Sequence, residues 1–433
     1  MVGVQIMYIQ TSNDDLKKMY SRFNPNSALT SEELEDYYVN MDQNEIKVEE
    51  LENSLVISYE TRQPVKLLFM GHRGSGKSTA LNYLVSLLNR ERGTNFLIIY
   101  YDILELLDNN DIDYTDILFT ILSKIMAEAK ANGIEIKTSL VKSVPEWWNK
   151  TNIANIFDNS DENLNEIKFI SYLFETLSRM KNESTARKEI RGGIQPRVTE
   201  LITIINNVIE EVEKSEKQVL VIIDNLEKCN HSKTLELFHY NSSQLALPKC
   251  NIIYTFPISL RSSNHFIEIK SYFHDVIVYP NIPIYDIEGV LQINSRNFMK
   301  EVAEKRISLD LFTPDALEYI IEMSGGVLRE YIRIIRASAL RAISRKKSLI
   351  DKSIAVEIIN ENKDVYQHLL KLDSETCELL KEISETKYIG NDERLMGLLH
   401  DLCVLEYKDK TSWYDLNPIV RLILEENNII EGR

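Results

Sequence analysis

The sequence predicts an α/β fold in which a five-stranded parallel sheet carries a helical insertion and is followed by an all-helical lid and a winged-helix domain. Short apolar runs alternate with amphipathic segments as far as residue 286, which is typical of a doubly wound parallel sheet. From residue 287 the pattern is helical, until two short alternating strands appear near the C-terminus. The expected parts are an N-terminal helical segment (1–60), the sheet domain (61–286, with the insertion at about 133–216), the lid (287–370) and the winged helix (371–433).

The composition is that of a soluble, acidic protein. The chain has 433 residues and a net charge of −16, with 27% charged and 44% hydrophobic residues. Because an acidic surface repels phosphates, any DNA contact needs a local basic patch. No run reaches the roughly 18 apolar residues of a membrane helix, so we expect a cytoplasmic protein without a membrane anchor. The cysteines form no C-x-x-C pair, which argues against a zinc site and a disulfide framework: Cys229, Cys250, Cys377 and Cys403.

Residues 1 to about 60 are polar and helical in pattern. Helices are expected at 14–23, 31–39 and 45–57. In the last of these, Ile46, Leu51 and Leu55 form a modest apolar stripe that favours docking on the sheet domain. The alternative is a solvated leader.

A glycine-rich loop follows the first strand, Val65 to Met70, and precedes a helix. Gly71, Gly76, Lys77 and Ser78 match the G-x-x-x-x-G-K-[ST] pattern of a phosphate-binding loop (P-loop). Lys77 is expected to face the β and γ phosphates of ATP, and the Ser78 hydroxyl to ligate Mg²⁺. The residues expected to contact nucleotide are Gly71, His72, Arg73, Gly74, Ser75, Gly76, Lys77, Ser78 and Thr79.

The next strand, 95–102, and a helix at 114–131 continue the alternation. The insertion then ends in a strongly periodic helix at 197–213. Trp147 and Trp148 either anchor a partner or pack in a core. The basic stretch at 186–193 is either a solvated face or reaches a neighbouring subunit's nucleotide.

The strand at 218–224 ends in Asp224. A carboxylate at the tip of a buried strand downstream of a P-loop is the expected second holder of Mg²⁺. Two further strands follow, at 251–257 and 275–280. Thr255 lies at the carboxyl end of its strand, where it either touches the γ phosphate or the attacking water, or is an ordinary strand residue. Arg261 has the chemistry of a finger that reaches a neighbour's site, although a surface arginine is the commoner case.

The lid has clear helix boundaries. Thr313 and Pro314 are typical of a helix start, and Gly325 with Gly326 closes that helix. The following helix opens with Arg329 and is basic as far as residue 347. Either it binds nucleic-acid phosphates, or its first arginine reaches the bound nucleotide.

The C-terminal part predicts helices at 374–385 and 392–401, then two strands within 403–416 around a turn at 409–411. Helices followed by such a ribbon favour a winged helix. The helix before the ribbon is acidic, so it is poorly suited to reading DNA.

The order of these parts resembles the AAA+ and STAND branch of P-loop ATPases, especially its initiator-like and bacterial defence-associated members. The segments that carry the likeness are GHRGSGKST, IIDNLE, YTFP and SGGVLR. The resemblance implies that Gly71 to Thr79 is Walker A, Asp224 the Walker B acid, Thr255 the sensor-1 position and Arg329 the sensor-2 arginine.

Two departures from that pattern matter. Asn225 stands where such ATPases carry a glutamate that orients the attacking water, and an acid returns only at Glu227. Because an amide cannot act as a general base, hydrolysis must use Glu227 or another acid, or be slow. Phe256 stands in place of the sensor arginine of many STAND switches.

Three functions remain in competition. The first is a slow or partner-stimulated switch ATPase, in which ATP and Mg²⁺ control association of copies and engagement of a separate effector, in antiphage defence if the resemblance holds. The chain shows no Cys/His nucleophile pair and no metal-spaced carboxylate cluster beyond the ATPase, so an effector would be another protein. The second is a DNA-binding initiator or loader, and the third is a scaffold that never hydrolyses.

Overall fold

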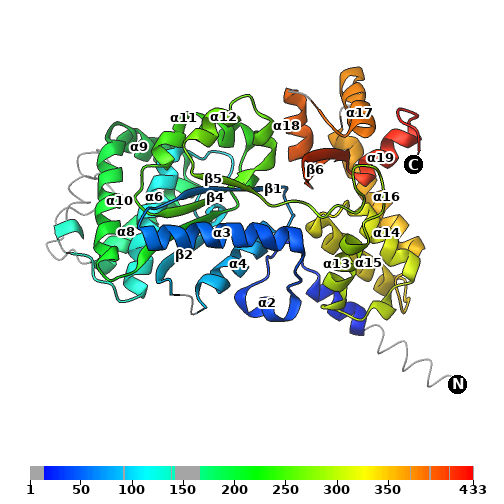
Figure 1. Cartoon of the computed structure of the whole chain (residues 1–433), viewed down its shortest axis with the longest axis horizontal. Coiled ribbons are helices and arrows are strands. Elements are labelled where there is room, and N and C mark those ends of the chain that lie inside the picture. The colour runs from blue at the N-terminus through cyan, green and yellow to red at the C-terminus, as the bar shows by residue number, and fades with distance from the viewer. Residues whose placement is uncertain are drawn as a thin grey trace.

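The computed structural model describes residues 14–90, 93–137, 139–141, 166–370, 372–389, 392–408 and 410–432. A sheet with helices on both faces occupies the middle of the molecule, with the insertion at one end and the lid and C-terminal part at the other (Figure 1). Trp147, Trp148, Asn391 and Asp409 lie outside the described residues.

The predicted five-stranded parallel sheet is confirmed. Its strands lie in the order β2-β3-β4-β1-β5, and every neighbouring pair is parallel. Since all five run the same way, their carboxyl ends meet at one edge, where open α/β sheets bind ligands. The strands are β1 (Lys66–Gly71), β2 (Phe96–Asp102), β3 (Gln218–Asp224), β4 (Asn251–Pro257) and β5 (Asp275–Val278).

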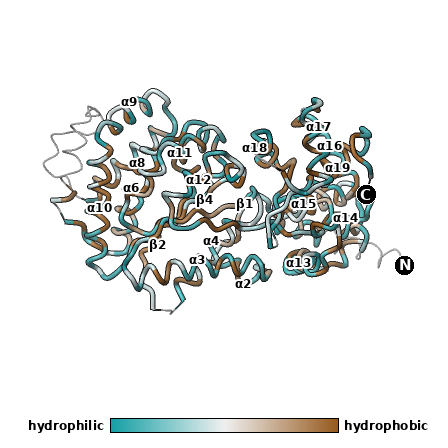
Figure 2. The backbone as a smooth tube through the Cα atoms, turned by 45° about the horizontal axis from the view of Figure 1, so that its top comes forward, coloured by the Kyte–Doolittle hydropathy of each residue, from teal (hydrophilic) through white to brown (hydrophobic). Residues whose placement is uncertain are grey.

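Both faces of the sheet are buried, which explains why its strands read as apolar runs. Leu67 and Phe69 of β1 pack with α3 (Asp42–Thr61) and α4 (Lys77–Leu88), whereas Leu68 and Met70 face the opposite side. Hydrophobic residues accordingly gather along the central strands (Figure 2). The second face is covered by helices that include α6 (Tyr114–Ala131), α10 (Val198–Glu213) and α11 (His231–Leu245). The short α5 (Ile103–Leu106) directly follows β2.

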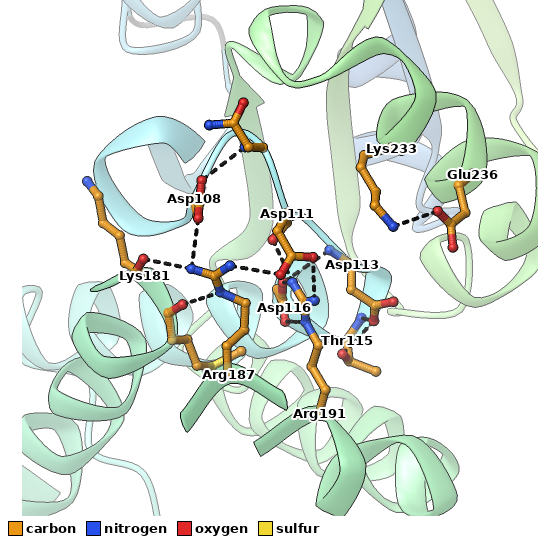
Figure 3. A network of polar contacts seen from close by, with 12 residues as sticks. Asp108, Asp111, Asp113, Thr115, Asp116, Lys181, Arg187, Arg191, Lys233 and Glu236 are labelled. Carbon is orange, nitrogen blue, oxygen red and sulfur yellow. Dashed lines mark hydrogen bonds and ion pairs between the residues drawn. The ribbon is translucent and has the colours of Figure 1, made fainter. Parts of the chain in front are cut away.

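The insertion packs on this second face through α8 (Glu166–Asn182), α9 (Ser184–Ile194), η1 (Gln195–Arg197) and α10. In its basic stretch Lys188 is exposed, whereas Arg187 and Arg191 are engaged by aspartates of the same chain. Arg187 bonds Asp108 and Asp111 at 2.9 and 2.8 Å, and Arg191 bonds Asp111 and Asp116 at 2.7 and 2.5 Å (Figure 3). These ion pairs tie the insertion to the loop that follows β2, so both arginines are engaged within the chain.

The N-terminal segment is docked, not solvated. Its first helical residues, 14–22, place Leu16 and Met19 in the core of the lid. In α3, Leu51 and Leu55 are buried as expected, but Ile46 is half exposed and Val48 takes its place in the stripe. The intervening α2 (Ser31–Tyr37) has a complete capping box at Thr30.

The chain after β5 is mostly helical, as predicted. Thr313 precedes α14 and Pro314 opens it, and α14 ends just before Gly325 and Gly326. The lid contains α13 (Ile293–Glu304), η4 (Leu309–Leu311), α14 (Pro314–Met323), α15 (Leu328–Ser344) and α16 (Lys352–Leu369). The remaining elements are α17 (Ser374–Thr386), α18 (Glu393–His400), β6 (Val404–Lys408), β7 (Ser412–Leu416) and α19 (Pro418–Glu426).

β6 and β7 pair antiparallel beside the helices of the C-terminal part. These are the elements that a winged helix requires, and that assignment stays a prediction.

Throughout the described ranges, every helix is too short or too polar to span a lipid bilayer.

Candidate nucleotide site

The P-loop joins the end of β1 to the start of α4 at the carboxyl edge of the sheet. Gly74 and Gly76 have φ angles of 84° and 104°, a region in which residues with a side chain are strained. A Cβ at Gly74 would also lie 2.6 Å from the Cβ of Arg329. Glycine is therefore needed at Gly74 both for the turn and for the close approach of the lid.

Lys77 is fully enclosed at the start of α4. Its Nζ donates to the carbonyls of Gly71 and His72 at 3.0 and 2.9 Å and lies 3.1 Å from Oε1 of Glu227. Burial alone would raise the pKa of Glu227, but the contact with Lys77 holds that pKa below its ordinary value. The buried Oε2 of Glu227 and the buried hydroxyl of Ser75 accept no hydrogen bond from a described residue. A water could donate to this carboxylate oxygen, and the Ser75 hydroxyl could donate to an incoming phosphate.

Asp224 and Ser78 form the oxygen pair expected to hold Mg²⁺. The Ser78 hydroxyl acts on the Asp224 carboxyl by lowering its pKa, and the Tyr100 hydroxyl donates to Oδ2 of Asp224 at 2.8 Å. Burial, together with the nearby Glu227 carboxylate, raises the pKa of Asp224. A hard dication would relieve that repulsion and prefers oxygen ligands of this type, so the residues present fit Mg²⁺.

Asn225 lines the same cavity as the P-loop, but its side chain is bonded to the end of another strand. It adopts the left-handed conformation with φ of 67°, and its side-chain amide donates to Oδ2 of Asp102 at 2.5 Å. Asp102 ends β2 and is the register partner of Asp224 at the end of β3. The first acid after Asp224 that reaches the phosphate region is consequently Glu227, in the short η2 (Leu226–Lys228).

Thr255 and Arg73 hold the segment that carries Glu227. The buried Thr255 hydroxyl accepts the backbone N–H of Leu226, the residue before Glu227, at 3.0 Å, and it also helps to lower the pKa of Glu227. Arg73 donates through Nε to the Glu227 carbonyl at 3.0 Å. Both residues therefore act on the position of Glu227.

Arg329 lies against the loop from the start of α15. Its backbone N–H donates to the Gly74 carbonyl at 3.0 Å. Burial lowers the pKa of its guanidinium, while Glu227 opposes that shift. Lys228 lines the same cavity, and burial together with Arg329 lowers its pKa. Two enclosed cations thus lie on the side of the cavity that faces the P-loop.

The C-terminal ribbon also touches the P-loop. The backbone N–H of Glu406 in β6 donates to Nε2 of His72 at 2.7 Å, and burial, with Lys77 nearby, lowers the pKa of His72 to about 3. Arg261, in η3 (Ile258–Ser262) after β4, pairs with the Glu406 carboxylate and donates to the Ser412 hydroxyl at 2.9 Å. Here Arg261 joins the sheet domain to its own C-terminal ribbon instead of reaching a neighbour.

A cavity of about 620 Å³ lies beside the loop, within the size range of small-molecule sites. The P-loop, the ends of β2 and β3, and the lid line one part of it, and the segment before α2 lines another. The backbone N–H of Leu29 donates to the Thr79 hydroxyl at 3.2 Å, and Asn82 donates to the Leu29 carbonyl at 2.8 Å. Sequence reasoning missed this segment and Tyr100, because no motif marks residues that reach the site only through tertiary packing.

Residues 49–256 match the KAP family P-loop domain, a stretch that contains β1 to β4 and the whole loop. This part of the chain is therefore a P-loop NTPase domain, as its glycine-rich motif predicts. No curated protein sequence matches the chain.

Several solved structures show a distant likeness in fold. Cdc6p from Pyrobaculum aerophilum is 13% identical, with 94% of this chain and 98% of that chain covered and a TM-score of 0.44. A Walker-type ATPase of Pyrococcus abyssi is 15% identical over 93% of this chain and 99% of that chain, with a TM-score of 0.46. The structure of Drosophila ORC bound to DNA is 9% identical, with 95% of this chain and 91% of that chain covered and a TM-score of 0.42.

Proposed function

We propose that the chain is an ATP-binding switch ATPase that couples its nucleotide state to association of copies and engagement of a separate effector protein. The observation that carries the proposal is that two other parts of the chain contact the P-loop itself. Arg329 of the lid bonds the Gly74 carbonyl, and Glu406 of the C-terminal ribbon bonds the His72 side chain. A nucleotide that binds one arrangement of these contacts better than another must shift the balance between them.

The contact between Lys77 and Glu227 gives the switch a resting state. Bound Mg²⁺ would neutralise phosphate charge, held by Ser78 and Asp224. Lys77 exchanges its ion pair with Glu227 for the β and γ phosphates, and the released Glu227 carboxylate can then orient the attacking water and accept its proton. Until that exchange, the candidate base is paired with the lysine, which supports a resting state in which Glu227 is not available to activate water.

The initiator or loader alternative loses its main support in the lid. The basic stretch of α15 and its end is largely paired with acids of the same chain: Arg333 with Glu330, Arg341 with Glu357 and Glu361, Arg345 with Glu357, and Lys347 with Asp351. Charges already neutralised by carboxylates release few counterions on binding a phosphate backbone. A role in antiphage defence rests on the sequence resemblance alone and is proposed only on that ground.

Hydrogen exchange in three nucleotide states tests the switch. The full chain is compared without nucleotide, with Mg²⁺ and ADP, and with Mg²⁺ and a non-hydrolysable ATP analogue, while light scattering reports association. We expect exchange in β6 and at the start of α15 to differ between the ADP and ATP-analogue states, together with a larger mass in one of them. Equal exchange and equal mass in both nucleotide-bound states would contradict the switch, even if nucleotide binds tightly.

A further inference from the structure

Two imidazoles and a carboxylate meet where α11 packs on α12 (Phe266–Ser271), outside the lining of the nucleotide cavity. His239 lies on α11, His265 precedes the first residue of α12, and Glu268 follows three positions later. The rings of His239 and His265 stack with centroids 3.7 Å apart, and Nε2 of His239 lies 3.2 Å from Oε2 of Glu268. One ligand atom from each residue lies within 4.8 Å of the other two.

We propose that His239, His265 and Glu268 bind a single transition-metal dication of the Zn²⁺ class. Imidazole nitrogen and carboxylate oxygen are ligands of this ion at about 2.0 to 2.2 Å, and three protein ligands plus water complete its tetrahedron. Ligand atoms in such a tetrahedron lie about 3.3 to 3.5 Å apart. The pair formed by His239 and Glu268, at 3.2 Å, lies close to that spacing, and His265 and Glu268 are exposed, so their side chains have room to rotate towards a bound ion.

A second cavity adjoins this cluster and supplies room for the water ligands. It measures about 170 Å³ and is lined by His265 and its neighbours Ser262 to Asn264, facing Asp392 and Glu393 at the start of α18. That volume far exceeds the roughly 10 to 15 Å³ that one water needs. Asp392 is paired with Arg394, but the Glu393 carboxylate, on a chain of net charge −16, also favours accumulation of a cation at this place.

Ligand chemistry separates this site from the nucleotide site. Imidazole favours zinc, cobalt, nickel and copper, whereas Mg²⁺ favours all-oxygen sites such as the pair of Ser78 and Asp224. Within the described part of the chain, none of the four cysteines joins the cluster. The site could not be predicted from the sequence, because His239 and His265 are 26 positions apart and meet only through helix packing.

A bound metal ion is expected to affect the stability of the fold. The metal would join α11, which follows the segment carrying Glu227, to α12, which follows the segment carrying Arg261. A ligand that binds only the folded state raises the melting temperature. We therefore expect Zn²⁺ to stabilise the chain without taking part in nucleotide chemistry.

The test uses tag-free, full-length, metal-stripped protein. Zn²⁺ is titrated in competition with a chromophoric chelator, and Co²⁺ is followed by its visible absorption. We expect one ion per chain with a dissociation constant in the micromolar range or below, and no displacement by millimolar Mg²⁺. His239→Ala and Glu268→Gln should each weaken Zn²⁺ binding by more than about tenfold, the least that loss of even an outer partner of a metal site costs.

His368→Ala is the matched control, since His368 is an exposed histidine on α16 far along the chain. It should leave the affinity for Zn²⁺ unchanged. Thermal melting and nucleotide titration without Zn²⁺ check that each variant is folded, and Glu268→Gln alters only an exposed side chain. The proposal would be overturned if the parent chain bound no stoichiometric Zn²⁺. It would also be overturned if Glu268→Gln and His239→Ala bound Zn²⁺ as tightly as the parent chain does.

Discussion

The side-chain amide of Asn225 donates to Asp102 at 2.5 Å, so the residue after Asp224 is bonded to the end of the neighbouring strand. The two strands that end in Asp102 and Asp224 lie in register, so the amide bridges neighbouring strand ends. Glu227 instead lies 3.1 Å from Lys77, at the place where phosphate would bind. The absence of a glutamate at position 225 is thus matched by the placement of another acid two residues later.

The first prediction concerns which acid serves as the base. Glu227→Gln should lower ATP turnover by about 100-fold or more while ATP stays bound, because the amide cannot take a proton. Asn225→Glu should not raise turnover, since the new carboxylate would face Asp102 and be repelled by it. Turnover and retained nucleotide are measured on the same preparations.

Asn225→Ala serves as the control for loss of the bridge to Asp102 alone. A rise in turnover in Asn225→Glu would instead show that water already sits beside residue 225. Unchanged turnover in Glu227→Gln would mean that the base lies elsewhere.

The second prediction concerns Lys77. Lys77→Ala should weaken ATP binding by about 100-fold or more, because the charge that faces the phosphates is lost. It also leaves the Glu227 carboxylate buried without its cation, and breaking a buried pair in this way costs about 3 to 5 kcal/mol of the free energy of unfolding. Fluorescent-nucleotide titration and chemical denaturation measure the two effects separately.

The double variant Lys77→Ala, Glu227→Gln distinguishes these effects. It should recover much of the lost stability, because no charge is left unpaired, and it should still fail to bind ATP. Normal ATP affinity in a folded Lys77→Ala variant would contradict nucleotide binding at this loop.

The third prediction is a pH dependence that comes from His72. Burial lowers its pKa from the ordinary 6.5 to about 3, so the folded state keeps the ring neutral while the unfolded state takes up a proton below pH 6.5. Its contribution to stability is therefore fully present above pH 6.5 and is lost as the pH falls towards 3. Between pH 6.5 and 4 this group should cost about 3 kcal/mol of the free energy of unfolding.

His72→Gln isolates that contribution. Glutamine keeps an oxygen that can accept the Glu406 N–H but does not titrate, so the difference in unfolding free energy between the two proteins should change by that amount across the same pH range. Every other titrating group is common to both. A constant difference would show that His72 is reached by water and protons in the folded protein.

The strands and the loop could be predicted from sequence because their signals are local. The expected bounds of α6 and β4 agree with the structure, since each is an uninterrupted periodic or apolar run between turn residues. The P-loop could be placed from its glycine spacing alone. In contrast, the contacts of Arg187 and Arg261 depend on aspartate and glutamate side chains about 75 to 145 positions away in sequence, which no periodicity reports.

The bond between Asn225 and Asp102 was equally out of reach of sequence reasoning. Its left-handed conformation is one that asparagine tolerates, but nothing in the local pattern indicates that Asp102 would accept its amide. Ile46 illustrates the same limit of sequence reasoning in a helix. Three apolar residues predict a buried stripe, but only the packing shows that Val48 is buried and Ile46 is half exposed.

The fourth prediction concerns DNA. At about 150 mM salt the chain alone should bind duplex DNA no more tightly than micromolar, because the basic side chains at 333–347, in α15 and just after it, are largely paired within the lid. Fluorescence anisotropy with a labelled duplex, repeated over a range of salt, measures both affinity and its salt slope. Nanomolar binding with a steep slope would favour the loader function.

The last prediction concerns the effect of Arg261 on the rate of ATP hydrolysis. While the C-terminal ribbon contacts His72, Arg261 is held by the Glu406 carboxylate, so it cannot reach a second subunit. Basal turnover should therefore lie well below the roughly 1 to 100 per second of phosphoryl-transfer kinases, as in GTPases that lack a supplied arginine. Glu406→Ala should release Arg261 and raise turnover, and the rise should grow with protein concentration because a trans contact is bimolecular.

The double variant Glu406→Ala, Arg261→Ala distinguishes a released arginine from a loosened ribbon. It lacks the same carboxylate and should therefore loosen the ribbon equally, yet its turnover should return to the basal level. Sedimentation at each concentration shows whether turnover rises with association. If the dilute parent chain already hydrolyses ATP at tens per second as a monomer, or if the double variant stays as active as Glu406→Ala, then Arg261 serves only to hold the ribbon and the site is complete within one chain.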